Sequence, residues 1–253
     1  MTGRTLYPYC RFYADGYDLS GYTRQFGPLV WEYEEYESTA LTDGSKNVLV
    51  GHPTISPQVL NGILDNTATV GLHIVASTAG IERTVMIPIG DRAAPAAGNP
   101  VFCGQFPQKD YKMEGDGIVH ASVNFGPWST SADSLLYDQP WGLLLLAKSA
   151  KTAANSATGA GIDNGAASTA GGYLVYQVFS GDGTATISID DSADDSSYSA
   201  LSGATSGEID FSNPTAGLVA LGKTATVRRY LRWQLSLNTA SSVTFALAFV
   251  RGR

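Results

Sequence analysis

Short runs of apolar and polar residues, many of them alternating and ended by turn-forming residues, make up most of this 253-residue chain. Such runs predict β-strands, because successive side chains of a strand point to opposite faces of a sheet. Asp15-Gly16 is a strong hairpin signal between the runs at 11–14 and 17–22. Further strands are predicted at residues 29–34, 71–76, 83–89, 117–125, 173–179, 184–189, 231–237 and 243–250.

One segment has helical spacing instead. In SPQVLNGILDN, Ser56 suits the N-cap, Pro57 the first helical position and Asn66 the exit. Four apolar residues would share one face of this helix, namely Val59, Leu60, Ile63 and Leu64. The spacing therefore predicts one short helix at 56–66 that lies against a sheet.

A change of composition divides the chain into two β units. Residues 147–172 contain almost no large apolar side chain except Ile162, so this stretch cannot form a core of its own. We interpret it as a low-complexity linker or an extended surface arm. It separates a first unit at 1–146 from a second at 173–253, where turns recur at the short intervals typical of a β-sandwich.

The overall composition favours a folded, mainly β protein. Hydrophobic residues make up 43% of the chain and charged residues 15%, and there are 28 glycines and 13 tyrosines. The formal net charge of −7 makes the chain a poor candidate for gripping nucleic acid, because phosphate contacts need Lys and Arg. An acidic surface could still surround or guide nucleic acid, since like charges prevent sticking.

The cysteines and the apolar runs limit location and redox chemistry. Cys10 and Cys103 stand far apart in no metal or redox spacing, and we interpret them as small core residues rather than a disulfide. The chain opens without an apolar signal segment, and its longest apolar run, at 143–147, is too short to cross a bilayer. We therefore expect a protein made and folded in the cytosol, without contact to membranes.

The stretch GLVALGKT at 217–224 fills every fixed position of the phosphate-binding pattern G-x-x-x-x-G-K-[ST]. A working phosphate loop joins a strand to a helix whose N-terminal amides face the anion. Residues 225–231 are instead β-branched and aromatic and lead into a strand pattern. We therefore predict a buried strand at 218–221 and a turn at Gly222, with no nucleotide site.

Two acidic runs are candidates for chemistry. The first could offer carboxylates to Ca²⁺ but lacks the order of an EF-hand, so a solvated hairpin turn is preferred for Asp190, Asp191, Asp194 and Asp195. The second could hold a catalytic carboxylate pair, but a solvated strand edge is preferred for Glu32, Glu34, Glu35 and Glu37.

The remaining candidates are isolated. His52, His73 and His120 lie far from one another and from either cysteine in the sequence, and the last two fall inside strand patterns. The sequence contains no G-x-S-x-G elbow and no paired Cys and His. We therefore expect no enzyme, with no catalytic, cofactor-binding or metal-binding residues and no cofactor.

Several stretches resemble the major tail (tail tube) proteins of long-tailed, siphovirus-like bacteriophages. FYADGYDLSGYTRQFGPLVWEYEE and the later VLVGHPTISPQVLNGILDN resemble the start of these proteins, and KMEGDGIVHASVNF resembles a later strand. GIDNGAASTAGG, ATISIDDSADDSSYSAL, VRRYLRWQLSL and SVTFALAFVRGR match the C-terminal part of longer members. The resemblance covers most of the chain but not residues 92–112.

The resemblance implies a fold and an assembly. The fold would be a tail-tube-like β-sandwich or barrel with one short flanking helix, followed by a second, C-terminal β-sandwich that decorates the outside. Hexameric rings would stack head to tail into a tube for DNA ejection. The residues before Phe12 and the loop at 92–100 are candidates to become ordered on assembly.

The resemblance also implies partners and a location. The partners would be other copies of the chain and the tape measure, tail terminator and baseplate proteins, while genomic DNA would pass through without specific binding. The protein would reside in the virion, as part of the phage tail, after assembly in the host cytoplasm.

Two other readings of the sequence stay open. One is another phage structural component, such as a capsid decoration, neck or baseplate protein built from similar β units. The other is a carbohydrate-binding adhesion module, which would explain the second unit alone. Trp233 alternates with polar residues beside Leu231 and Leu235, so we expect it in the core rather than on a sugar-binding platform.

Overall fold

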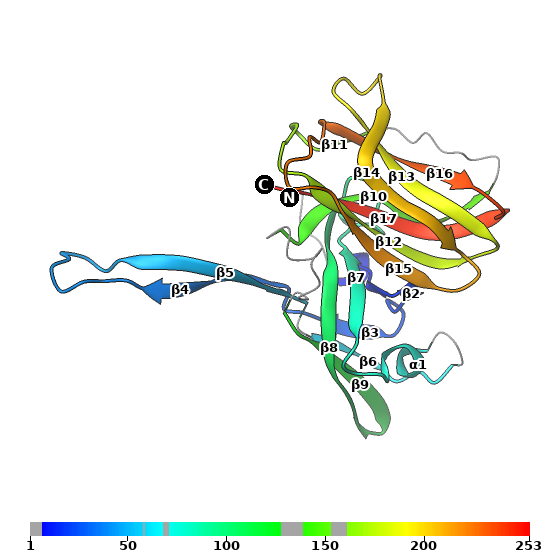
Figure 1. Ribbon diagram of the computed structural model, residues 1–253. Coiled ribbons are helices and arrows are strands. Elements are labelled where there is room, and N and C mark those ends of the chain that lie inside the picture. Colours follow the sequence, from blue (N-terminus) through cyan, green and yellow to red (C-terminus); the bar gives the residue numbers. More distant parts are fainter. Residues whose placement is uncertain (1–6, 58, 68–70, 128–138, 153–160) are drawn as a thin grey trace.

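The computed structural model describes residues 7–57, 59–67, 71–127, 139–152 and 161–253. In these residues the regular structure is almost entirely β, with one short α-helix and one short 3-10 helix. Figure 1 shows a layered β body, a smaller β part beneath it and a long hairpin that projects to one side. The expectation of a mainly β fold with one short helix is confirmed.

The elements follow the chain in a simple order. The first half contributes η1 (Tyr7–Tyr9), β1 (Tyr13–Ala14), β2 (Tyr17–Asp18), β3 (Thr23–Phe26), β4 (Val30–Glu37), β5 (Val48–Ser56), β6 (Val59–Ile63), α1 (Leu72–Ala76), β7 (Glu82–Pro88), β8 (Pro100–Asp116) and β9 (Ile118–Phe125). The second half contributes β10 (Trp141–Thr152), β11 (Ile162–Asp163), β12 (Gly172–Gly181), β13 (Thr184–Ser192), β14 (Ser199–Asp210), β15 (Thr215–Ala220), β16 (Tyr230–Leu237) and β17 (Ser242–Arg251).

One sheet connects the two halves of the chain. Its strands run in the order β15-β12-β17-β10-β8-β7-β1-β2, and β9, β6 and β3 branch from it. The branch point is β8, because its early residues pair with β7 and β10 while its residues from Gln108 onward pair with β9. A second sheet, β11-β16-β13-β14, covers the strands of the C-terminal half.

The C-terminal sandwich has a core built by strand alternation. Ile187 and Ile189 of β13 and Trp233 of β16 point toward Phe245 of β17, and all four are at most 5% exposed. Fully burying a side chain of this size stabilises a fold by about 1.5–3 kcal/mol. This value is an upper estimate, because a compact unfolded chain already buries part of its apolar surface. The burial of Trp233 confirms its assignment to the core.

Another cluster of buried residues, separate from the core of the C-terminal sandwich, joins the two halves of the chain. Tyr13, Met86, Val101 and Cys103 of the first half pack against Leu144, Tyr173, Val175 and Ala246 of the second. Cys103 is fully buried, as expected for a small core residue, while Cys10 is partly exposed, and both are free thiols. The two halves therefore share a hydrophobic core as well as a sheet.

The predicted helix at 56–66 is wrong, and the helix lies elsewhere. Val59–Ile63 forms β6, whose backbone groups pair with β3 on one side and β9 on the other. The short helix is α1 at Leu72–Ala76, inside the stretch predicted as a strand at 71–76. Its buried residues Leu72, Val75 and Ala76 have helical spacing, so tertiary packing decided both segments.

The predicted linker is in part regular structure. Its first six residues, 147–152, continue β10, which pairs with β17 as far as Thr152. Small and polar residues suit this end of the strand because alternate positions there face solvent. Ile162 belongs to β11, and residues 153–160 lie outside the described part of the chain. The division into two units at 146 and 173 stays a prediction, and its first boundary falls within β10.

The other turn predictions are confirmed. Asp15 and Gly16 form the turn between β1 and β2, with φ of 50° and 83° as a tight hairpin requires. The stretch at 92–100 is a loop up to β8, and it is tied to the body because the Gly98 N–H donates to the Leu144 carbonyl at 2.7 Å. Whether this loop or the residues before Phe12 change on assembly stays a prediction.

Candidate assembly surfaces

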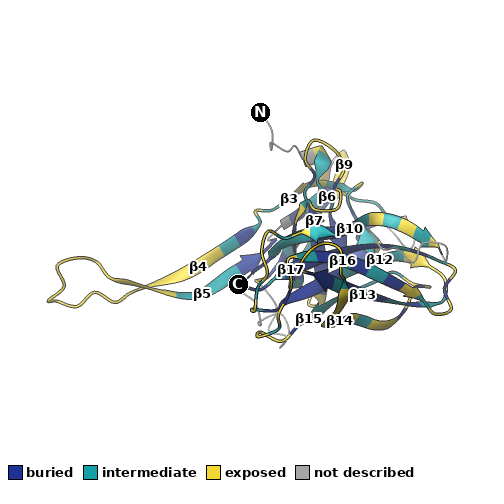
Figure 2. Cartoon of the chain, turned by 90° about the horizontal axis from the view of Figure 1, so that it is seen from above, coloured by how far each residue is buried: buried dark blue, intermediate teal, exposed yellow. Residues whose placement is uncertain are grey.

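The β4–β5 hairpin projects from the body of the protein (Figure 1). Its base is anchored, since Val30 and Ile55 are only 7% and 2% exposed. Beyond the base, β4 is exposed from Glu32 onward and β5 is exposed at 48–50, while Gly51, Pro53 and Thr54 are half-buried (Figure 2). Among the described residues, β4 and β5 pair only with each other, so the outer edge of each strand has unpaired backbone groups.

Large apolar side chains gather on this hairpin. We define the hairpin surface as six residues that are 40% to 107% exposed: Tyr33, Tyr36, Leu41, Val48, Leu49 and Val50. Tyr36 lies opposite Leu49 on one face, and Val48 and Val50 lie opposite glutamates on the other. An isolated two-stranded ribbon is marginally stable in water, and clustered exposed apolar groups are typical of interaction sites.

The acidic run of β4 gives the same hairpin a negative charge. Glu32, Glu34, Glu35 and Glu37 are all exposed, which confirms the prediction of a solvated strand. Glu37 lies 3.7 Å from Lys46, and Glu34 accepts a hydrogen bond from the Tyr36 hydroxyl, which raises the pKa of Tyr36. The hairpin surface is thus both apolar and acidic.

A second exposed apolar group lies at the far end of the branch sheet. Ile63 of β6, Met113 of β8 and Ile118 and Val119 near the β8–β9 turn are 42% to 60% exposed. This end points away from the C-terminal sandwich (Figure 1). It is a smaller candidate contact than the hairpin surface.

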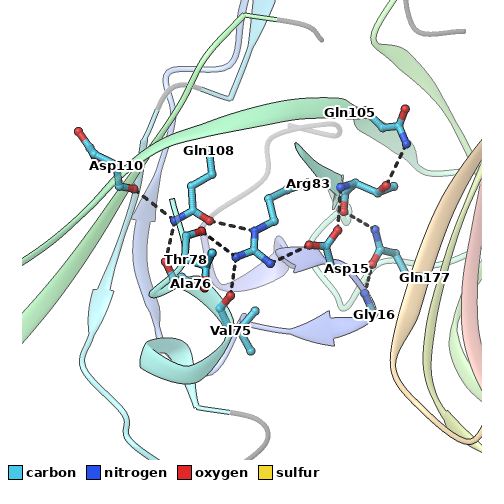
Figure 3. A network of polar contacts seen from close by, with 11 residues as sticks. Asp15, Gly16, Val75, Ala76, Thr78, Arg83, Gln105, Gln108, Asp110 and Gln177 are labelled. Atoms are coloured by element: carbon cyan, nitrogen blue, oxygen red, sulfur yellow. Dashed lines mark hydrogen bonds and ion pairs between the residues drawn. The ribbon is translucent and has the colours of Figure 1, made fainter. Parts of the chain in front are cut away.

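A buried polar network fixes the β1–β2 turn in place (Figure 3). Arg83 of β7 is 8% exposed and donates to Asp15 at 2.9 Å, to the Gln108 side chain at 2.9 Å and to the Val75 carbonyl at 2.7 Å. Burying a charge this deeply costs free energy unless the charge is paired and hydrogen-bonded. Asp15 supplies the opposite charge, and the Gln108 side chain and the Val75 carbonyl accept further hydrogen bonds. The network holds α1, β7, β8 and the turn together.

Gln177 of β12 extends this network into the C-terminal half (Figure 3). It is fully buried, accepts a hydrogen bond from the Gly16 N–H at 2.7 Å and donates to the Thr84 carbonyl at 2.8 Å. One side chain therefore clamps the β1–β2 turn and β7 to the sandwich. The β1–β2 turn, β7 and the sandwich are therefore held in one arrangement.

Arg83 and Gln177 were not among the candidate residues predicted from the sequence. Arg83 opens the run RTVMIP and Gln177 interrupts the run YLVYQVF, and both runs are otherwise typical of buried strands. That interruption is the signal that could have identified them, because buried polar side chains need a specific partner. The partners themselves come from turns distant in sequence, which no local pattern predicts.

The phosphate-loop pattern is not a phosphate loop. Residues up to Ala220 form β15, which pairs with β12, and the Ala225 N–H donates to the Gly222 carbonyl in a turn. The next element is the strand β16 rather than a helix, and Lys223 is exposed on the turn. The predicted turn is confirmed, and the predicted strand is found as the end of β15. Its residues 218–220 are half-buried rather than buried, and the buried Leu221 lies just after the strand.

The aspartate cluster is only partly a solvated turn. Asp194 accepts hydrogen bonds from the Ser196 and Ser197 amides in the β13–β14 turn, which lower its pKa. Asp190 and Asp191 instead belong to β13, where the prediction of a solvated turn is wrong. Their carboxylates pair across the sheet, Asp190 with Arg232 at 2.9 Å and Asp191 with the Arg228 amide at 2.8 Å.

The histidines are not brought together. His120 lies in β9, as predicted, with its Nε2 3.4 Å from Arg24, and His73 lies on α1 with its Nδ1 2.9 Å from the Tyr111 hydroxyl. His52 lies in β5. Within the part of the chain that the structure describes, no group of three or more His, Cys, Asp or Glu could hold a metal ion. Of the described helices, none has the length and apolar character needed to span a membrane.

Comparison with known proteins gives a weak likeness. No protein-family model and no curated protein matches this chain. Among solved structures, the chain is similar to the SPP1 Dit (gp 19.1) protein, described as a paradigm of the hub adsorption apparatus in phages that infect Gram-positive bacteria. The identity is 10%, the TM-score is 0.32, and the match covers 95% of this chain and 99% of that chain. A likeness of this size establishes neither fold nor function, so the proposals below rest on the sequence and the geometry.

Proposed function

We propose that this chain is a structural protein of a phage tail, and that it is the tail tube subunit. The observation that carries the proposal is the hairpin surface, which exposes six large apolar side chains on a projecting ribbon whose two strand edges pair with no other described strand. Such a surface is stabilised when another chain covers it. The sequence resemblance to tail tube proteins names the assembly in which copies of this chain would do so.

The shape of the hairpin favours assembly in one direction. In the proposed assembly the projecting ribbon docks on a different surface of the next copy, so the contact joins two unlike patches. Contacts between unlike patches produce rings where the rotation closes and filaments where it does not. In the proposed tube, copies form rings, which are hexameric by the family resemblance, and the rings stack into a shaft.

The rest of the proposal concerns partners and location. The tube would end on terminator and baseplate proteins and enclose a tape measure protein, within the virion and after assembly in the host cytoplasm. Genomic DNA passes through without specific binding, because a chain with a net charge of −7 offers phosphates little to hold. We propose no catalytic step and no cofactor.

A double substitution on the hairpin tests the proposal. Tyr36→Lys with Leu49→Lys places charges on both members of an exposed cross-strand pair. We expect the monomer to keep its stability to within about 0.5 kcal/mol, because surface substitutions cost little. Tube formation, followed by sedimentation and electron microscopy, should be abolished. Tyr36→Phe with Leu49→Met keeps the apolar character and should assemble like the parent chain.

The other outcomes separate the competing functions. Tubes that still form from the lysine variant would show that the hairpin surface does not mediate assembly. A parent chain that binds capsids, necks or baseplates without forming tubes would favour a different phage component. Persistent monomers that bind glycans would favour an adhesion module, although Trp233, the residue considered for a sugar platform, is only 5% exposed.

A further inference from the structure

A pocket of about 370 Å³ lies between the start of β10 and the end of β17. Trp141, Leu143 and Phe249 contribute apolar wall, and Asn164, Arg251 and Arg253 contribute polar groups. The volume lies within the range of sites for small ligands or single side chains, and apolar walls with a few polar groups are typical of such sites. The proposal of a tail tube does not depend on this pocket.

The charge of the pocket is unusual for so acidic a chain. Two guanidinium groups line it, and its described lining includes no Asp or Glu. Arg251 donates only to neutral acceptors among the described residues, including the Val227 carbonyl at 2.6 Å and the Arg228 carbonyl at 2.7 Å. Burial lowers the pKa of Arg251, and the nearby charge of Asp191 opposes that shift. Asp191 is itself engaged, because it accepts the Arg228 N–H at 2.8 Å.

One donor of a pocket-lining residue is left without an acceptor among the described residues. It is the buried Nε of Arg251. Buried donors without partners are rare, since each costs about 1–3 kcal/mol. The indole N–H of Trp31 also has no described partner, but Trp31 lies outside the pocket lining, with its ring centre 5.9 Å from the Arg253 guanidinium.

Arg253 is held in position rather than left free. With its amide oxygen turned toward the guanidinium, Gln139 accepts from Arg253 Nε at 2.9 Å and from a terminal nitrogen at 3.2 Å. The Trp31 ring lies on another side of the same group. A guanidinium fixed in this way loses less freedom when it binds a ligand, which favours affinity.

We propose that this pocket is a carboxylate-binding site. Two guanidinium groups, one of them with an unpaired Nε, and the absence of a described acidic lining residue suit a carboxylate, which guanidinium groups bind through charge-assisted hydrogen bonds. The apolar wall would contact the carbon chain that bears the carboxylate. The source is either a glutamate of a second copy, for which the exposed acidic run of β4 is the candidate, or a free organic acid. The proposal does not depend on the tail function.

Titration of the full chain with defined probes tests this site. The probes are glucuronate, the α-amide of N-acetylglutamate and a blocked peptide of residues 31–37, with the glutamine forms of the last two as neutral controls. Side-chain NMR signals of Arg251 and Arg253 in the unmodified protein report binding directly. We expect the acids to shift both signals and the neutral controls to leave them unchanged, with binding weakened by salt because charge attraction is screened.

Two variants identify the groups responsible. Arg253→Gln removes an exposed charge and should weaken binding of the acids by about tenfold or more. Arg251→Lys keeps the charge but loses the planar fork and should also weaken binding. Lys223→Gln removes an exposed charge that is not part of the pocket lining and should leave binding unchanged.

The outcomes also distinguish the two sources. Tighter binding of the 31–37 peptide than of the free acids would assign the site to a second copy, and the reverse order would assign it to an organic acid. Unshifted arginine signals at saturating acid, or equal affinity in the parent chain and Arg253→Gln, would overturn the proposal. Because the readout is binding by the isolated chain, failure here would leave the tube proposal standing.

Discussion

At Gly16, both the backbone conformation and the close packing of neighbouring atoms exclude a side chain. Its φ is +83°, in the left-handed region that favours glycine. A Cβ there would lie 2.3 Å from the Val178 carbonyl oxygen and 2.4 Å from the Thr215 nitrogen, both of them backbone atoms. The turn therefore packs backbone against backbone where the two halves of the chain meet, and Gln177 completes the contact by accepting the Gly16 N–H.

Substitution at Gly16 should accordingly be costly. We expect Gly16→Ala to lower the free energy of unfolding by about 2–4 kcal/mol, the sum of backbone strain and overpacking. Gly165 is the matched control, because its φ is +81° and a Cβ there would meet nothing within 4 Å. Gly165→Ala should cost only about 1 kcal/mol. Equal losses in urea unfolding of the two variants would show that the close packing around Gly16 contributes nothing.

The attachment of β11 to β16 is the clearest electrostatic contact between elements. Arg229, just before β16, binds both carboxylate oxygens of Asp163 in β11, at 2.8 and 2.7 Å. This side-chain pairing, helped by the Gly165 amide, holds the pKa of Asp163 at about 2. Both side chains are 45% exposed, so salt should weaken the pair.

The lowered pKa of Asp163 predicts a pH dependence. A carboxylate whose pKa is lower in the folded than in the unfolded state contributes stability above its unfolded pKa of about 4. That contribution is lost as the pH falls from about 4 through 2. An NMR titration of the Asp163 carboxyl should have its midpoint near 2, and Arg229→Gln should move it upward. A midpoint that does not respond to Arg229→Gln would rule out the pairing in solution.

At the level of elements, sequence patterns predicted strands better than the one helix. Long alternating runs such as the one in β16 specify both the strand and its buried face, and GLVALGKT was correctly interpreted from the strand-forming residues after it. SPQVLNGILDN carries helix signals yet forms β6 between two strands, because pairing on both sides outweighs a local preference. α1 has only five residues, too short a stretch for its spacing of buried residues to stand out from a strand pattern in the sequence.

The candidate surfaces were predicted only in part. The acidic and tyrosine-rich run of β4 was visible in the sequence as an exposed strand. The run projects from the body because β4 pairs only with β5 among the described strands. The spacing of residues in the sequence does not show which strands will pair. The carboxylate pocket likewise gathers residues from β10, β17 and the loop after β11, which lie far apart in the chain.

At the scale of the whole molecule, the shared core predicts cooperative unfolding. Tyr13, Met86, Val101 and Cys103 lose their cover if the second half of the chain is removed. Calorimetry should therefore show one transition for the full chain, and a fragment ending at residue 150 should not fold stably because it lacks β12 and β17. Two separated transitions, or a soluble folded fragment, would contradict the shared core and support two independent units.

The central claim is that copies of this chain assemble through the projecting hairpin into a hollow shaft. Cryo-electron microscopy of the concentrated, unmodified protein tests it most directly, because one reconstruction shows the assembly, its lumen and the position of the β4–β5 ribbon. The account predicts stacked rings with an open centre, in which each ribbon is covered by a neighbouring copy. Solid filaments, compact closed oligomers, or rings whose ribbons stay exposed to solvent would contradict it.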